Sequence, residues 1–228
     1  MVLGRARAQA LGMPRSTPAV ALILAASSLA LGACGGGGDD GGGTAPQVQD
    51  TAAVQEPADL GPFLMRKGEE PGFDVIDEPR TLNGVDAFVR DLGLTATDAQ
   101  RLRRAGMVSF TYQPTKGPSH AGITNVQLFD NEDGAQSQLV HEVSGDTIRA
   151  QIARDTTGTD TGRNIRRFTV PGVPSARGWG LESPHVSNVY WVQGRCLLVL
   201  GNQGPGDLDS RVAKGVQAIY GRTDGQCP

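Results

Sequence analysis

Cys34 is the residue whose type and position point most directly to chemistry, because its thiol follows two small residues, Gly32 and Ala33. A thiolate is a nucleophile that can be modified covalently, and small side chains let the backbone enter a peptidase cleft. Residues Val20–Leu31 form a largely apolar run of 12 residues. This run is too short for a transmembrane helix, which needs roughly 20 apolar residues, and it is typical of a signal peptide.

The segment ahead of the apolar run is basic, with three arginines and no acidic residue before Asp39. Leu31-Gly32-Ala33-Cys34 resembles the bacterial lipobox, in which the cysteine receives a diacylglyceryl group and the signal is cut just before it. We therefore expect residues 1–33 to be a lipoprotein signal peptide. Two acyl chains on Cys34 would anchor the chain stably on the outer face of a bacterial cell membrane. The alternative is an ordinary cleaved signal followed by an incidental cysteine.

Cys196 and Cys227 are the two cysteines that remain after Cys34. In an exported chain, an even number of cysteines favours a disulfide. The bond would close a loop of about 30 residues and contribute about 3 kcal/mol to stability by the chain-entropy model. Two free thiols, or half of a metal site, are the alternatives, but neither a histidine nor a third cysteine lies near them in sequence.

Other candidates for catalysis or metal binding fit their motifs poorly. His120, His141 and His185 lack metal-ligand spacing to one another or to a cysteine, and we expect them at the surface. The acidic stretch 130–134 resembles a calcium loop, but an EF-hand needs a glutamate six residues after its glycine, where this chain has Val140. Helix capping explains that stretch better. We expect no metal and no cofactor.

Phosphate-binding and hydrolase signatures are incomplete as well. The Gly-rich stretch 201–206 lacks the Lys-Ser/Thr ending of a P-loop, and no serine has a Gly-x-Ser-x-Gly context. Two groups of arginines could receive an anionic ligand or partner, although a solvated surface is the better explanation. They are Arg101, Arg103 and Arg104, and Arg163, Arg166 and Arg167.

The charge balance argues against nucleic-acid binding. The whole chain has 21 Lys+Arg and 24 Asp+Glu, and removal of residues 1–33, which carry three arginines, leaves a net charge of −6. Nucleic-acid binding relies on a basic face, so we expect no nucleic-acid partner.

Residues 34–78 are rich in Gly, Asp, Ala and Pro. Such a composition buries too little apolar surface to offset backbone ordering, so this stretch is expected to be a flexible tether. It contains two short apolar islands, at 62–65 and 73–76. The first is expected to make only a transient contact, and the second to add an edge strand or strap to the domain.

Residues 79–228 are long enough for one domain with one core. Helices are predicted near 81–91 and 97–105, the second with a capping box at Thr97-Asp98-Ala99-Gln100. Strands are predicted at 107–113 and 123–129, followed by a helix over 131–143, a second helical piece through 153 and an exposed loop at 155–164.

The C-terminal part contains the clearest pattern. Strands at 186–192 and 195–200 flank Gln193-Gly194, which reads as a hairpin connection that places Val192 opposite Arg195 and Trp191 opposite Cys196. Apolar residues on both faces indicate a hairpin covered on each side. A helix with Val212, Val216 and Ile219 on one stripe follows. Consecutive hairpins with segregated helices predict an α+β fold, an antiparallel sheet with helices packed on it.

The order of these elements supports a resemblance over about residues 80–228. The strand ending in Phe129-Asp130, the helix opening at Gly134-Ala135, the stretch Val170–Ala176 and the late hairpin and helix ending in a cysteine resemble small exported lipoproteins of high-GC Gram-positive bacteria. More distantly, the chain is similar to the extracellular sensor domains of bacterial serine/threonine kinases. Those domains commonly carry two disulfides, whereas only one is possible here. The resemblance implies an antiparallel α+β sandwich with a groove and no established activity.

These features together indicate a lipid-anchored extracytoplasmic binding or sensing domain that is not an enzyme. Its ligand and binding residues are not indicated by any motif. An accessory or scaffold subunit of a cell-envelope complex is the alternative, and a cell-wall hydrolase is a third class. A closed apolar pocket with a few polar groups would favour a small ligand. A large exposed apolar patch would favour an envelope-protein partner.

Overall fold

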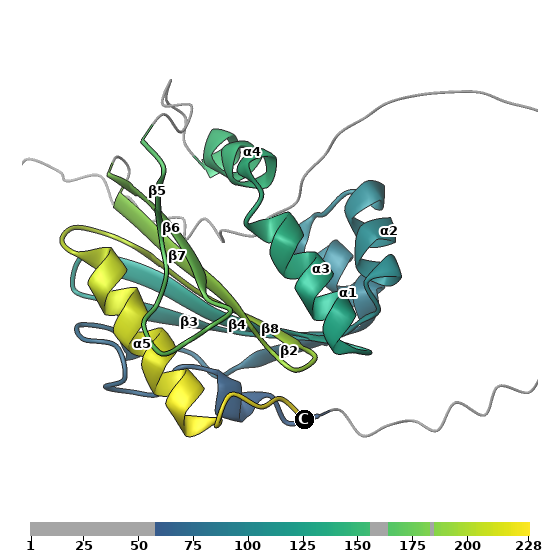
Figure 1. The fold of residues 1–228 in the computed structure, drawn as a ribbon, viewed down its shortest axis with the longest axis horizontal. Coiled ribbons are helices and arrows are strands. Elements are labelled where there is room, and N and C mark those ends of the chain that lie inside the picture. Colours follow the sequence, from purple (N-terminus) through teal and green to yellow (C-terminus); the bar gives the residue numbers. More distant parts are fainter. Residues whose placement is uncertain (1–57, 156–163, 183–184) are drawn as a thin grey trace, which may run out of the picture.

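The computed structural model describes residues 58–155, 164–182 and 185–228 (Figure 1). It confirms the predicted α+β class: one domain with an antiparallel sheet of eight strands and five α-helices in the described part of the chain. None of the described helices is long and apolar enough to cross a membrane. The elements are η1 (Gly61–Phe63), β1 (Asp74–Val75), β2 (Arg80–Asn83), α1 (Gly84–Leu92), α2 (Ala96–Arg104), β3 (Met107–Gly117), β4 (His120–Phe129), α3 (Glu132–Glu142), α4 (Gly145–Asp155), β5 (Arg166–Phe168), β6 (Arg177–Glu182), β7 (His185–Gln193), β8 (Cys196–Gln203) and α5 (Leu208–Arg222).

The sheet has the strand order β1-β3-β4-β8-β7-β6-β5, with β2 also paired to β3. Because side chains alternate along a strand, each central strand supplies two cores. One core, packed by α1–α4, includes Phe110, Tyr190 and Val199, and the other, packed by α5, includes Val126, Trp191 and Leu198. Figure 1 shows α5 apart from the group formed by α1–α4.

The central hairpin β7–β8 forms as predicted, but its predicted register is wrong by two residues. The two turn residues are Gly194 and Arg195, so that Gln193 lies opposite Cys196 and Trp191 opposite Leu198. The reason is the positive φ of Gly194, 50°, which a tight hairpin turn requires and which glycine adopts without a steric penalty. Gln193 therefore extends the strand instead of starting the turn.

The helical layer differs from the predictions in two places. The capping box of α2 uses Thr95 and Asp98, two residues before the expected Thr97. Val140, expected on the inner stripe of α3, is 68% exposed, because α3 instead turns Gln138, Leu139 and Glu142 inward. Asn131 caps α3 as predicted, since its side chain accepts a bond from the Gly134 amide (2.9 Å).

Residues 58–75, which we call the strap, form part of the fold, although the tether was expected to run to residue 78. The first apolar island is buried from Phe63 to Met65, and Phe73 of the second is buried as well, whereas Ile76 is exposed: the strap places Leu60, Phe63, Leu64, Met65 and Phe73 in the core beneath α5. The second island adds an edge strand, as predicted, because β1 pairs with β3. The contribution of the first island to the core was underestimated. Its residues become buried only because α5, which lies far along the sequence, packs against them.

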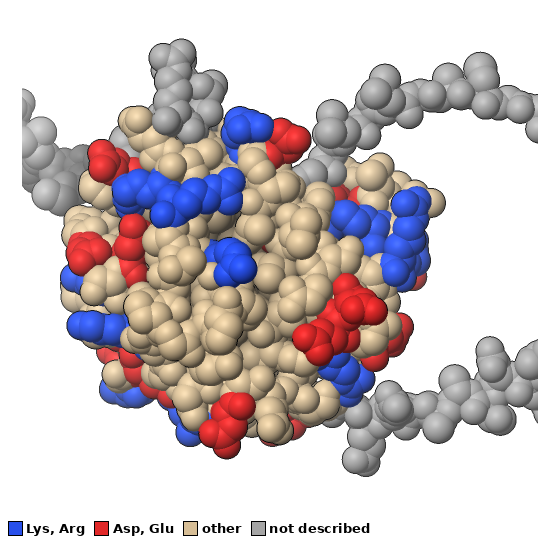
Figure 2. Space-filling view, in the orientation of Figure 1, with Lys and Arg blue, Asp and Glu red and all other residues tan. Residues whose placement is uncertain are grey.

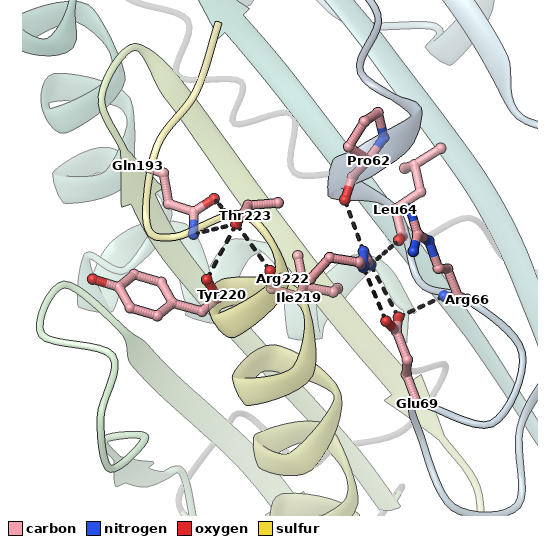
Figure 3. Close-up of polar contacts among 9 residues, drawn as sticks. All are labelled: Pro62, Leu64, Arg66, Glu69, Gln193, Ile219, Tyr220, Arg222 and Thr223. Atoms are coloured by element: carbon pink, nitrogen blue, oxygen red, sulfur yellow. Dashed lines mark hydrogen bonds and ion pairs between the residues drawn. The ribbon is translucent and has the colours of Figure 1, made fainter.

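Arg222, in the last turn of α5, fixes the strap in place (Figure 3). Its guanidinium donates to the carbonyl oxygens of Pro62 (2.9 Å) and Leu64 (2.8 Å) and pairs with the Glu69 carboxylate (3.0 Å). Next to it, Thr223 joins α5 to Gln193 of β7 (3.0 Å). The C-terminal end of α5 therefore holds both the strap and the central hairpin.

Cys196 and Cys227 are bonded, with their Cα atoms 5.8 Å apart. Cys196 lies in the buried start of β8, and Cys227 lies beyond the end of α5. The bond therefore attaches the C-terminal tail, and through it α5, to the central hairpin.

We predict that Cys227→Ala lowers the free energy of unfolding by about 3 kcal/mol, because the unfolded chain loses a constraint. The helix should remain docked, since its apolar stripe and Arg222 hold it independently. Urea unfolding under non-reducing conditions measures the loss, and far-UV circular dichroism verifies the helix content. An unchanged unfolding midpoint would contradict this account of the disulfide.

Candidate functional site

Several residues nominated from the sequence lie apart from one another. Cys34 is outside the described residues. His120 and His185 begin strands β4 and β7, and His141 lies on α3. Within the described ranges, no group of three or more His, Cys, Asp or Glu residues is placed to hold a metal ion.

Most of the described arginines in these two groups make ion pairs or hydrogen bonds with other residues of the chain. Arg103 pairs with Asp86, Arg166 with Asp209 (3.2 Å), and Arg167 donates to the Val143 carbonyl (2.7 Å). Arg163 lies outside the described residues. The loop after β8 leads into α5, where Asp207 caps the helix by accepting from the Ser210 amide (3.1 Å). A carboxylate in that place opposes phosphate binding, because it already uses the favourable helix N-terminus.

A chain of buried polar contacts links α2 to α3. Arg101 donates to Gln138 and also pairs with Asp98 (3.2 Å). The Gln138 amide in turn donates to Glu142 (2.6 Å). Gln138 is only 2% exposed, yet both ends of its amide are satisfied, as buried polar groups normally are.

Another group of polar side chains on the same face of the sheet is not satisfied. Asn188 of β7 lies opposite Trp179 of β6 and Gly201 of β8. Its amide lies over Gly201, because a Cβ there would come within 2.3 Å of the Asn188 Oδ1. The Asn188 Nδ2 and the Trp179 Nε1 are both buried and have no hydrogen-bond partner within the described part of the chain.

Gln151 of α4 is a third buried polar side chain in the core on this face of the sheet. It lies between Ile148 and Ile152, which pack into the same core as Trp179, so one helical stripe turns all three toward the sheet. Gln151 is 1% exposed, and neither amide atom has a partner among the described residues. Gln151, Trp179 and Asn188 are named here the amide site. Farther along the same face, the Asn125 Oδ1 and Gln127 Oε1 are also buried without a described partner.

The amide site offers hydrogen bonds but no acid, base or nucleophile. Amide and indole groups supply N–H donors and carbonyl acceptors and do not titrate in the ordinary pH range. Apolar residues surround them, including Leu181 and Val186. Such a combination suits recognition of a small neutral molecule that has hydroxyl or amide groups.

His141 is one of two histidines, with His120, that depart from the expected surface position. It is partly buried, and its Nε2 has no partner among the residues the structure describes. Burial, together with the smaller effect of the Arg101 charge, lowers the pKa of His141 to about 4, against a still smaller opposite effect of Asp98. The ring is therefore neutral near pH 7, and it lies beside the α2–α3 polar chain.

Sequence reasoning missed the amide site, since nothing distinguishes Gln151 or Asn188 from ordinary surface amides in an unaligned sequence. One signal was available. Gln151 occupies the i+3 position between Ile148 and Ile152, which places it on the apolar stripe of a predicted helix.

Gln151→Leu should stabilise the ligand-free domain by about 1–3 kcal/mol, because it removes a buried amide that has no compensating bond. The matched control is Gln138→Leu on α3, which should destabilise by a similar amount because it removes the hydrogen bonds that Gln138 makes with Arg101 and Glu142. Thermal and urea unfolding of the two variants measure the difference. Equal destabilisation by both would show that Gln151 is satisfied within the folded chain.

Comparison with known proteins gives little further definition. No family model matches the chain, and no curated protein matches it. Among solved structures, the extracellular domain of PknH from Mycobacterium tuberculosis aligns with 66% of this chain and 86% of its own length, at 14% identity and a TM-score of 0.38.

Proposed function

We propose that the chain is a lipid-anchored extracytoplasmic domain that binds a small neutral ligand and does not catalyse a reaction. The observation that carries the proposal is the amide site, in which both amide atoms of Gln151, the Trp179 Nε1 and the Asn188 Nδ2 are buried without a hydrogen-bond partner among the described residues. An unsatisfied buried amide costs about 1–3 kcal/mol. Two amides and one indole in the same core are readily explained if a bound molecule satisfies them.

The alternative, an accessory or scaffold subunit, draws less support from the described surface. The large apolar side chains exposed there are Ile76, which follows β1, Val108 of β3 and Val140 of α3. A protein-docking surface normally gathers such residues into one patch. On the face drawn in Figure 2, acidic and basic side chains are interspersed around a broad uncharged area, with no extended field of one sign.

The anchoring part of the proposal comes from the sequence. The basic start, the apolar run Val20–Leu31 and the small residues before Cys34 occur in the order that lipoprotein processing requires. The strap is consistent with an attachment at the N-terminal side, because it fixes the first described residues to the core that also holds the C-terminal helix.

Cys34→Ser should move the protein from the membrane fraction to the soluble extracytoplasmic fraction, because the acyl chains would have no attachment site. Cell fractionation and the intact mass of the wild-type protein verify this. We expect a mass that begins at Cys34 and includes a diacylglyceryl group. An unlipidated protein that begins elsewhere would contradict the anchor while leaving the binding proposal standing.

The binding proposal is tested on the full-length protein extracted from the membranes of its native host. Native mass spectrometry should detect an added mass that is lost on denaturation, and Gln151→Leu should reduce its occupancy at least tenfold, about the effect of one lost hydrogen bond of 1.4 kcal/mol. Gln217→Leu, on the outer part of α5 and bonded to the Pro171 carbonyl (2.8 Å), is the control and should retain the ligand. Equal retention by both variants would place the ligand elsewhere.

A further inference from the structure

Glu70 is a carboxylic acid buried where the strap passes beneath α5. It is 1% exposed. Its Cβ lies 3.6 Å from the position that a Cβ on Gly215 would take, so the helix backbone lies directly above it. The position exists only while the strap is docked, because Glu70 belongs to the strap and the groups that bury it belong to the sheet and to α5.

The surroundings of Glu70 solvate a charged carboxylate poorly. Asn202 of β8 donates to its Oε1, but its Oε2 has no partner among the described residues. Thr115 of β3 and the Oδ1 of Asn202 approach each other over Gly122, where a Cβ would lie 2.6 and 2.2 Å from their oxygens. Both oxygens are buried and also lack a partner in the described chain. A neutral carboxyl, which can donate a proton to such an acceptor, fits this environment better than a carboxylate.

Few charged groups compensate Glu70. Arg211 of α5 is the one whose charge lowers its pKa, and burial outweighs this effect and raises the pKa of Glu70 to about 7. Arg211 also contacts His120 of β4 (3.1 Å), whose ring packs against Phe73 of the strap. Glu69, the neighbouring acid, is paired with Arg222 at the other end of the strap. Thr115 and Asn202, which β3 and β8 turn toward Glu70, are neutral.

We propose that the strap is a pH-responsive latch: the proton on Glu70 favours the docked strap, and loss of that proton shifts the strap toward an open state. In the open state Glu70 is hydrated, and the apolar residues of α5 that pack against the strap are exposed to water. Opening would also add 18 residues to the connection with the N-terminal region, an extension of at most roughly 60 Å.

The size and sign of the effect follow from proton linkage. An open strap releases the Glu70 proton near the ordinary value of 4.5, whereas the closed strap retains it until about pH 7. The opening equilibrium constant therefore rises with pH between these values and is constant outside them. The total change is at most about 300-fold, since each unit of pKa difference is a factor of ten.

Hydrogen exchange of the full-length protein between pH 4.5 and 8 tests the latch, after correction for intrinsic exchange rates. Protection of strap amides, such as that of Phe73, which bonds to the Glu70 carbonyl (3.2 Å), should fall by up to about 300-fold as pH rises. Amides in the centre of β8 should not follow this change. A pH-independent strap, or an equal loss of protection in β8, would overturn the proposal.

Two variants separate the Glu70 proton from strap packing. Glu70→Gln should make strap protection independent of pH. Glu69→Gln weakens the pair with Arg222 and should lower protection at every pH while keeping the slope. A slope that survives in Glu70→Gln would overturn the proposal. If Glu70→Gln does not fold, 13C NMR titration of Glu70 in the wild-type chain decides: a midpoint near 7 supports the latch, and one near 4.5 overturns it.

Discussion

Burial of both faces of the central strands is the constraint on which the rest of this structure depends. Leu197 and Leu198 of β8 are adjacent, point to opposite faces and are both fully buried. A sheet of this kind needs two covers. The middle of the chain provides one in α1–α4, and the two ends of the described chain provide the other, as the strap and α5. The disulfide and Arg222 act on this second cover, where the chain ends would otherwise detach.

The same constraint gives meaning to the polar groups that remain between the layers. In a sheet exposed to water on one face, Asn188 or Asn202 would be hydrated. Here each must find a partner within the domain or a bound molecule. Gln138 shows that the fold can satisfy a buried amide completely, since Arg101 and Glu142 hold both of its ends. Function is therefore expected at two places. One is the group of amides between α4 and the sheet that have no described hydrogen-bond partner, and the other is the Glu70 carboxyl, of which only one oxygen has such a partner.

The architecture could be predicted from the sequence because its signals are local. Alternation marked the strands, Asn131 and the helical stripes marked α3 and α5, and apolar residues on both faces marked the hairpin as central. The hairpin register could not be predicted, because it depends on whether Gly194 opens or ends the turn. The strap was assigned to the tether for a related reason: Phe63 and Met65 have no amphipathic pattern, and only the groove beneath α5, formed by residues far along the chain, gives them a place.

The proposed binding site could not be predicted as a whole from the sequence, since it consists of one glutamine, one asparagine and one tryptophan from three elements. None belongs to a motif, and their importance comes from the partners they lack. Cys34 is the opposite case, in which the signal lies wholly in the local sequence and outside the described structure.

The most direct test of the binding proposal is a high-resolution crystal structure of the protein purified without denaturation from its native membrane. Electron density beside the Gln151 amide and the Asn188 Nδ2 would identify what satisfies them. The proposal predicts a small neutral molecule that accepts from Asn188 and bonds to Gln151. Ordered water alone, or direct bonds from these amides to the chain, would contradict a ligand site and leave the domain without one between α4 and the sheet.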